Sequence, residues 1–180
     1  MTDSARLADP RPAVMALPEA SAVILRHYDD PDRAGLGREL KALCRKKKLT
    51  LLVAGDARLA LSIDADGLHL AESFLSQNPG TWRLWLRPGM LLSIAAHSPK
   101  ALAKAAAADA DLALLSPVFP TKSHPDVGCI GVLRFTRWIK KAGLPVYALG
   151  GVNKGNALRL HSGGAAGWAA IGGLSENADA

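Results

Sequence analysis

Short apolar runs recur along this chain, separated by longer stretches that carry apolar residues at helical spacing. Seven of the runs are rich in aliphatic residues and predict β-strands at 21–27, 49–55, 67–72, 90–98, 112–119, 145–152 and 167–174. Most have apolar residues at consecutive positions, which is typical of strands buried on both faces of a parallel sheet.

The stretches between these runs predict helices. Helical spacing is found at 32–48, 56–63, 72–86, 98–110, 132–143 and 153–164, and Pro79-Gly80 interrupts the third segment. Ser98 before Pro99 is a favourable N-cap followed by proline at the first helical position. The strict alternation of strand and helix indicates an α/β fold with helices covering a parallel sheet.

Seven strand–helix units in a row favour a (β/α)8 TIM barrel over an open doubly wound sheet. We expect one domain over residues 1–180. The first 20 residues read as the tail of a strand and a short helical stretch, so the barrel is expected to lack its first strand in this chain. That strand would lie upstream of Met1, or another subunit of a homo-oligomer would cover the open edge.

Composition narrows the class of protein. No apolar run approaches the roughly 18 residues of a membrane span, and the N-terminus has no secretion signal, so we expect a cytoplasmic protein without a membrane partner. Cys44 and Cys129 lack the C-x-x-C spacing of metal and redox motifs and are expected to be free thiols without a functional role.

The formal charge of +6 and the pI near 9.6 favour an anionic partner. The densest basic run, 44–48, ends a predicted helix, where the helix dipole favours cations. Aromatic residues make up only 5% of the chain and do not interleave with basic ones. We therefore expect no nucleic-acid partner and favour a phosphorylated small molecule.

Polar residues follow the predicted strands, at the end of a barrel where functional groups collect. Four of the five histidines are in this set, and imidazole is suited to proton transfer near neutral pH. Each histidine could also be a structural, hydrogen-bonded residue. The candidate catalytic residues are His124, Arg26, Thr121 and Ser123, and the candidate pocket-lining residues are His27, Asp56, His69, Glu72, His97 and Lys122.

Two glycine pairs close the last two predicted strands. Gly150-Gly151 follows the strand at 145–152, and Gly172-Gly173 follows the strand at 167–174. Loops at these two positions in a barrel often bind phosphate through backbone N–H groups, which glycine allows an anion to approach. Tight turns are the alternative explanation of each pair.

The motifs "VILRHYD", "ADGLHLAE", "LSPVFPTKSHP" and "PVYALGGVNKGNA" resemble, in this order, the thiamine phosphate synthase and TenI family. The resemblance implies a TIM barrel that joins hydroxymethylpyrimidine diphosphate to thiazole phosphate and releases pyrophosphate with Mg²⁺. TenI-type members instead tautomerise the thiazole or lack an assigned activity. Thiazole phosphate, the pyrimidine diphosphate and thiamin phosphate are the ligands implied.

The resemblance also assigns roles to individual residues. Arg26 and Thr121 match residues that bind the diphosphate, and Ser123 replaces another of them. Gly150 and Gly151 match the glycines that hold the thiazole phosphate. This half of the family site is present.

Other positions depart from the family pattern. The expected metal-ligand positions hold Gly55 and Phe74, and two expected lysines are Tyr28 and His124. Mg²⁺ thus remains possible only if Asp56 and Glu72 compensate. Three hypotheses stay open: a transferase with a reworked diphosphate site, a TenI-like isomerase, and a non-catalytic binding protein.

Overall fold

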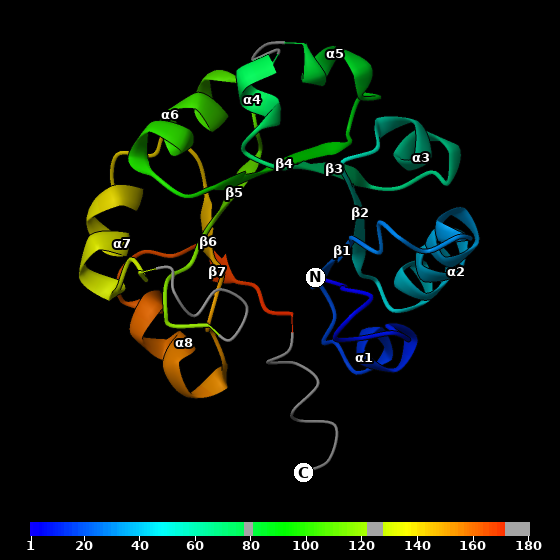
Figure 1. Cartoon of the computed structure of the whole chain (residues 1–180), viewed down its shortest axis with the longest axis horizontal. Coiled ribbons are helices and arrows are strands. Elements are labelled where there is room, and N and C mark those ends of the chain that lie inside the picture. The colour runs from blue at the N-terminus through cyan, green and yellow to red at the C-terminus, as the bar shows by residue number, and fades with distance from the viewer. Residues whose placement is uncertain (78–80, 122–127, 172–180) are drawn as a thin grey trace.

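The computed structural model describes residues 1–77, 81–121 and 128–171. Seven parallel strands follow one another in chain order and curl into most of a barrel (Figure 1). They confirm the seven predicted strands, although each is shorter than its apolar run. The strands are β1 (Ala22–Leu25), β2 (Thr50–Ala54), β3 (Gly67–Leu70), β4 (Leu91–Ala96), β5 (Leu112–Leu115), β6 (Val146–Ala148) and β7 (Gly167–Trp168).

Helices surround the sheet on its outer face (Figure 1). They are α1 (Arg11–Met15), α2 (Arg33–Lys46), α3 (Ala57–Ser62), α4 (Phe74–Gln77), α5 (Trp82–Trp85), α6 (Pro99–Ala107), α7 (Val132–Ile139) and α8 (Lys154–His161). The predicted segment 72–86 holds two short helices, and α7 ends four residues before the predicted 143. Within the described ranges, no helix has the length and apolar character needed to cross a membrane.

Alternate strand residues contribute to two separate cores. The larger core lies between the sheet and its helices and contains the fully buried Phe135 of α7. The smaller one fills the inside of the curl around Ile24, Leu52, Ala54 and Leu114. Because neighbouring residues of a strand point to opposite faces, this division identifies which positions face the barrel interior.

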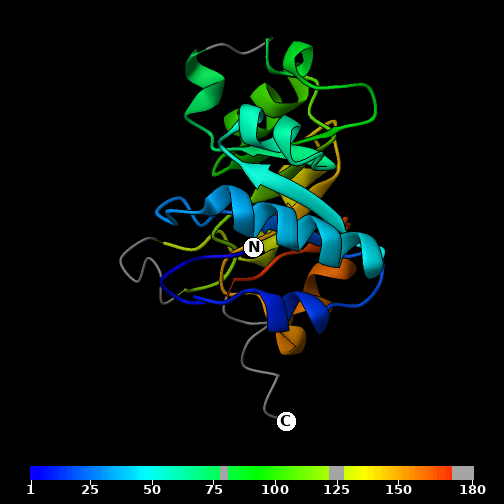
Figure 2. The same ribbon diagram turned by 90° about the vertical axis from the view of Figure 1, so that its right-hand side faces the viewer.

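The start of the chain lies in the opening between β1 and β7 (Figures 1 and 2). The backbone N–H of Thr2 donates to the Ile24 carbonyl at 2.9 Å, and the Met1 amine donates to the Ala170 carbonyl at 2.8 Å. These residues therefore connect β1 with the segment that follows β7, at the position predicted for the tail of a strand. The prediction of a TIM barrel that lacks its first strand is confirmed.

An aspartate anchors β2 to β3 at the amino ends of the strands. Asp66 precedes β3, and its backbone N–H donates to the Leu51 carbonyl at 2.8 Å. Its carboxylate accepts the Leu51 N–H at 2.8 Å through Oδ2 and Lys41 Nζ at 2.6 Å through Oδ1. One side chain thus joins a strand, its neighbour and helix α2.

The same arrangement recurs between β4 and β5. Asp111 accepts the Leu92 N–H at 2.7 Å and Arg83 Nη2 at 2.8 Å. Asp66 and Asp111 both end the sequence D-A-D, and the first aspartate of each D-A-D turn has a φ of +55°. The two D-A-D turns, 64–66 and 109–111, therefore hold the amino ends of four strands in register.

Candidate active site

The loop after β6 presents three consecutive backbone N–H groups. Gly150 and Gly151 have φ values of +89° and +65°, and neither their N–H groups nor that of Val152 has a hydrogen-bond partner within the described ranges. A Cβ on Gly151 would lie 2.3 Å from the Pro120 carbonyl oxygen. Glycine is needed here both for the backbone conformation and for the close approach of the loop after β5.

Arg26 follows β1 and contributes positive charge at the carboxyl ends of the strands. Its side chain is 31% exposed and lies 3.7 Å from the Asp3 carboxylate, a distance too long for a hydrogen bond. Its guanidinium carbon also lies 5.9 Å from the centre of the Tyr28 ring. By its contacts with the described residues, Arg26 is thus held loosely and retains N–H groups for an anionic ligand.

His69 of β3 and Ser93 of β4 form a buried pair. Their neighbours along each strand belong to the outer core, so both side chains face the barrel interior. The Nδ1 of His69 lies 3.0 Å from the Ser93 hydroxyl. Burial and the charge of Arg26 lower the pKa of His69 to about 4, so the imidazole is neutral at pH 7.

Three further candidates lie just after strands and have protein partners. Asp56 follows β2 and caps α3 by accepting the Leu59 N–H at 2.8 Å. Glu72 follows β3 and accepts the backbone N–H of His97 at 2.9 Å, while its Oε2 lies 2.8 Å from the His97 ring Nδ1. His97 is 55% exposed, so this histidine–carboxylate pair is open to solvent.

His27 differs from the expectation that it lines a pocket. Its ring is buried, with Nδ1 2.9 Å from the Thr2 hydroxyl and Nε2 3.4 Å from the Ala8 carbonyl oxygen. Both partners of the ring belong to the N-terminal segment, which covers His27. The structure gives His27 a structural role in holding the N-terminal segment.

Several predicted site residues lie outside the described residues. They are Lys122, Ser123, His124, Gly172 and Gly173. Thr121 is the last residue described before one of these gaps, and it is half-buried. The roles expected for these positions therefore remain predictions.

Sequence reasoning did not single out Ser93, Val152 or Arg33. A serine inside the apolar run 90–98 was a usable signal, because a buried hydroxyl requires a hydrogen-bond partner. Arg33 gave no signal, because an arginine in the first turn of a helix usually extends into solvent. In the structure it donates to the carbonyls of β1 and β2 at their carboxyl ends.

Over the part of the chain that the structure describes, the strand ends therefore combine unpaired backbone donors, a loosely held arginine and a buried neutral histidine. Residues 11–174 match the sequence profile of the family described as thiamine monophosphate synthase. The chain belongs to this family. Its members provide the relatives against which the site can be compared.

Two relatives and one solved structure illustrate the similarity. A protein of Aquifex aeolicus, provisionally named thiamine-phosphate synthase 2, is 35% identical over 83% of this chain and 80% of its own length. The thiamine-phosphate synthase of Geobacillus kaustophilus is 32% identical over 78% of this chain and 63% of its own. The thiamine phosphate pyrophosphorylase structure from Pyrococcus furiosus has a TM-score of 0.71 and 24% identity, covering 94% and 82% of the two chains, and shares the fold.

The two positions where the family resemblance predicts metal ligands are Gly55 and Phe74. Gly55 follows β2 with a φ of +70°, and the Tyr28 ring lies 3.5 Å from where its Cβ would be. The Phe74 ring packs edge-on against Trp82, with the ring centres 5.3 Å apart. Neither residue offers an oxygen ligand from its side chain.

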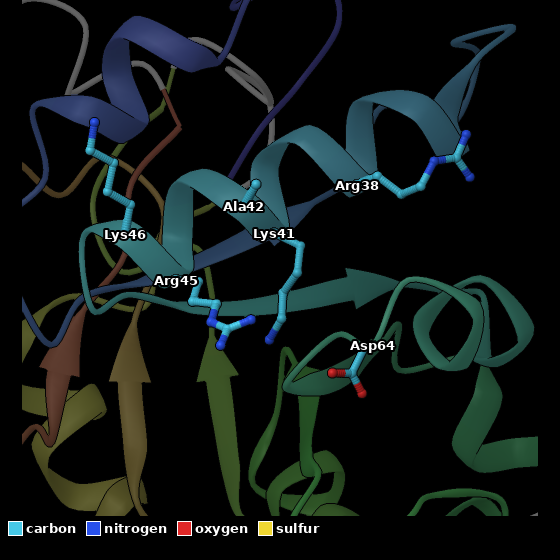
Figure 3. A pocket seen from close by; sticks show the side chains of 6 residues that line it. All are labelled: Arg38, Lys41, Ala42, Arg45, Lys46 and Asp64. Atoms are coloured by element: carbon cyan, nitrogen blue, oxygen red, sulfur yellow. The ribbon is translucent and has the colours of Figure 1, made fainter.

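A basic groove of about 680 Å³ lies between α2 and Asp64, a residue that precedes β3 (Figure 3). Lys41 and Arg45 point into the space beneath the helix, whereas Arg38 points along the helix and Lys46 points away from that space (Figure 3). Lys41 is already bound to Asp66. The groove thus belongs to the outer surface and contributes nothing to the candidate active site.

Proposed function

We propose that this protein binds thiazole phosphate at the carboxyl ends of its strands and joins it to a pyrimidine diphosphate, releasing pyrophosphate. Membership of the thiamine monophosphate synthase family supports the reaction class. The names of the relatives from Geobacillus kaustophilus and Pyrococcus furiosus are in keeping with it. In this proposal the loop after β6 binds the phosphate of thiazole phosphate, and Arg26 binds the diphosphate of the pyrimidine substrate.

The N–H groups of Gly150, Gly151 and Val152, which have no hydrogen-bond partner among the described residues, are the observation that carries this proposal. Consecutive N–H groups in a loop with positive φ form a concave donor surface suited to a phosphate group. The loop leads directly into α8, whose positive helix end adds to the attraction for an anion.

Arg26 supports the second half of the proposal. In the proposed reaction the thiazole nitrogen supplies the electron pair of a new bond to the pyrimidine's methylene carbon, the bond between that carbon and the diphosphate oxygen breaks, and pyrophosphate leaves with the bonding electron pair. A guanidinium that contacts the leaving group stabilises the negative charge that develops on it. This stabilisation is stronger when water is excluded from the site. The loose contact with Asp3 can be exchanged for a contact with the diphosphate.

Ligand comparison tests the phosphate site without any mutation. Calorimetry should show that thiazole phosphate binds at least about tenfold more tightly than the thiazole alcohol, because only the phosphate makes charge-assisted bonds to the loop. Incubation with both substrates should yield thiamin phosphate by mass spectrometry and an equal amount of pyrophosphate. Equal affinity for the two thiazoles, or no coupled product, would contradict the proposal.

The exposed His97–Glu72 pair favours a second candidate, a TenI-like thiazole tautomerase. A carboxylate that orients an imidazole is a common arrangement for moving protons. This alternative predicts that NMR detects interconversion of thiazole tautomers without the pyrimidine substrate, and that His97→Gln abolishes it. If the wild type forms thiamin phosphate but does not interconvert the tautomers, the synthase assignment stands and the tautomerase is rejected.

A further inference from the structure

Arg33 is the first residue of α2, and its side chain reaches back across the carboxyl ends of β1 and β2. Its Nη2 donates to the Ala54 carbonyl at 2.6 Å and to the Leu25 carbonyl at 3.2 Å. Its guanidinium carbon lies 5.0 Å from the centre of the Tyr28 ring. Two carbonyls and an aromatic face thus fix a positive charge beside the site.

Two backbone carbonyls that converge at one place make a site for a cation, and carbonyl oxygen is also a ligand that hard divalent metals accept. Ala54 directly precedes Gly55, one of the positions where the family resemblance expects a metal ligand. Here the guanidinium of Arg33 takes the two carbonyls. The chain therefore carries its own cation next to this position.

The described carboxylates near the strand ends do not fit Mg²⁺, which requires several oxygen ligands in near-octahedral geometry. Asp56 is engaged as the cap of α3, and Glu72 is engaged with His97. Over residues 1–77, 81–121 and 128–171, no group of three or more His, Cys, Asp and Glu side chains could hold a metal ion.

Tyr28 links Arg33 to Arg26, because both guanidinium groups lie against the same ring. The Tyr28 side chain is exposed, so the cluster borders solvent. Neither Nε nor Nη1 of Arg33 has a hydrogen-bond partner within the described residues. Nε is buried, whereas Nη1 is not. Both arginines therefore keep N–H groups that a ligand at the strand ends can reach.

We propose that Arg33 and Arg26 bind the diphosphate group of the substrate directly, so that this half of the site works without a divalent metal. The inference rests on the proposed function, in which diphosphate is the leaving group. When the carbon–oxygen bond breaks, the electron pair leaves with pyrophosphate, and the two guanidinium groups stabilise its charge through N–H donors. No proton transfer is needed for this step.

The test is a calorimetric titration of inorganic pyrophosphate into the full chain, first in EDTA and then with excess Mg²⁺. We expect binding in EDTA and no tighter binding with Mg²⁺. Arg33→Met should weaken binding about 10- to 100-fold, the range for losing a charge-assisted hydrogen bond. The control Arg38→Met removes the same charge from an exposed position of the groove in Figure 3 and should change affinity less than about twofold, because solvent and salt screen an exposed charge.

If Arg33→Met does not fold, Arg33→Lys takes its place in the titration. It keeps a positive charge for the carbonyls of β1 and β2, but an ammonium lacks the planar fork that can hold carbonyls and ligand together. With a folded Arg33→Lys protein, pyrophosphate binding should still be weaker than in the wild type. Affinity equal to the wild type would overturn the role of Arg33.

Two other results would overturn the inference: pyrophosphate binding that requires Mg²⁺, and equal losses in Arg33→Met and Arg38→Met. Thiazole phosphate binding, measured on the same proteins, separates this inference from the proposed function. If the wild type fails to bind thiazole phosphate yet binds pyrophosphate in EDTA, the proposed function fails while the arginine site is supported. If only pyrophosphate binding is lost in Arg33→Met, both are supported.

Discussion

Replacing Gly151 by alanine should destabilise the protein through two separate effects. The φ of +65° costs a side-chain-bearing residue about 1–2 kcal/mol. The added Cβ would also lie 2.3 Å from the Pro120 carbonyl oxygen and 2.8 Å from Phe119 Cβ, so the loop after β5 must move. Overpacking of this kind costs about 1–3 kcal/mol more.

Gly89→Ala is the matched control for Gly151→Ala. Gly89 has a φ of +85°, but nothing lies within 4 Å of the position of its Cβ. This variant should lose only about 1–2 kcal/mol, the cost of the backbone conformation. The difference between the two variants therefore measures the close approach alone.

Urea unfolding followed by circular dichroism gives both free energies. We expect Gly151→Ala to be less stable than Gly89→Ala by about 1–3 kcal/mol, which for a domain of this size lowers Tm by about 2–12 °C more. It should also bind thiazole phosphate less tightly, because the loop that carries the N–H donors has moved. Equal stability of the two variants would refute the reasoning.

Three other predictions concern titration, anchoring and thiol reactivity. His69 has a pKa of about 4 in the folded protein against 6.5 when unfolded, so the unfolded state binds its proton first as pH falls. As the pH falls from 6.5 to 4, the free energy of unfolding of the wild type should decrease by about 3 kcal/mol more than that of His69→Asn, at 1.36 kcal/mol per pH unit. Urea titrations measure both free energies, and above pH 6.5 the two should depend on pH in the same way. Asp66→Asn should lower the free energy of unfolding by about 1–3 kcal/mol, since it breaks the charge-assisted bonds to Leu51 and Lys41. The control Asp64→Asn removes only an exposed ion pair and should lower this free energy by less than about 1 kcal/mol. Burial raises the pKa of Cys44 to about 11, so at pH 8 a thiol reagent should modify the half-buried Cys129 first. The faster phase of the reaction with the reagent should therefore be absent in Cys129→Ser.

The strand order and the missing first strand could be predicted because they depend on patterns within short segments. Each apolar run marks one buried strand, and strict alternation with helices leaves few topologies. Strand ends were predicted too far along the chain, since apolar residues continue into the loops. The run 112–119, for example, continues past Leu115 into the buried Val118.

The site was less predictable, because it depends on where side chains point. The predicted strand 21–27 includes Arg26 and His27, and the period of a strand would have allowed only one of these two neighbours to face the pocket. Arg33 could not be found in this way, because its role depends on a side chain of α2 that reaches back across the carboxyl ends of β1 and β2. Such contacts between distant segments leave no local pattern in the sequence.

The two D-A-D turns have a consequence for how this scaffold can change. They anchor the sheet at the end of the molecule opposite the candidate site, through carboxylates that bond the neighbouring strand and a nearby cation. Residues at the other end, including those that contact a ligand, can then be exchanged without loosening these anchors. A library that randomises Tyr28, His97 and Thr121 while keeping both turns should thus yield mostly folded barrels, from which new ligand specificities can be selected.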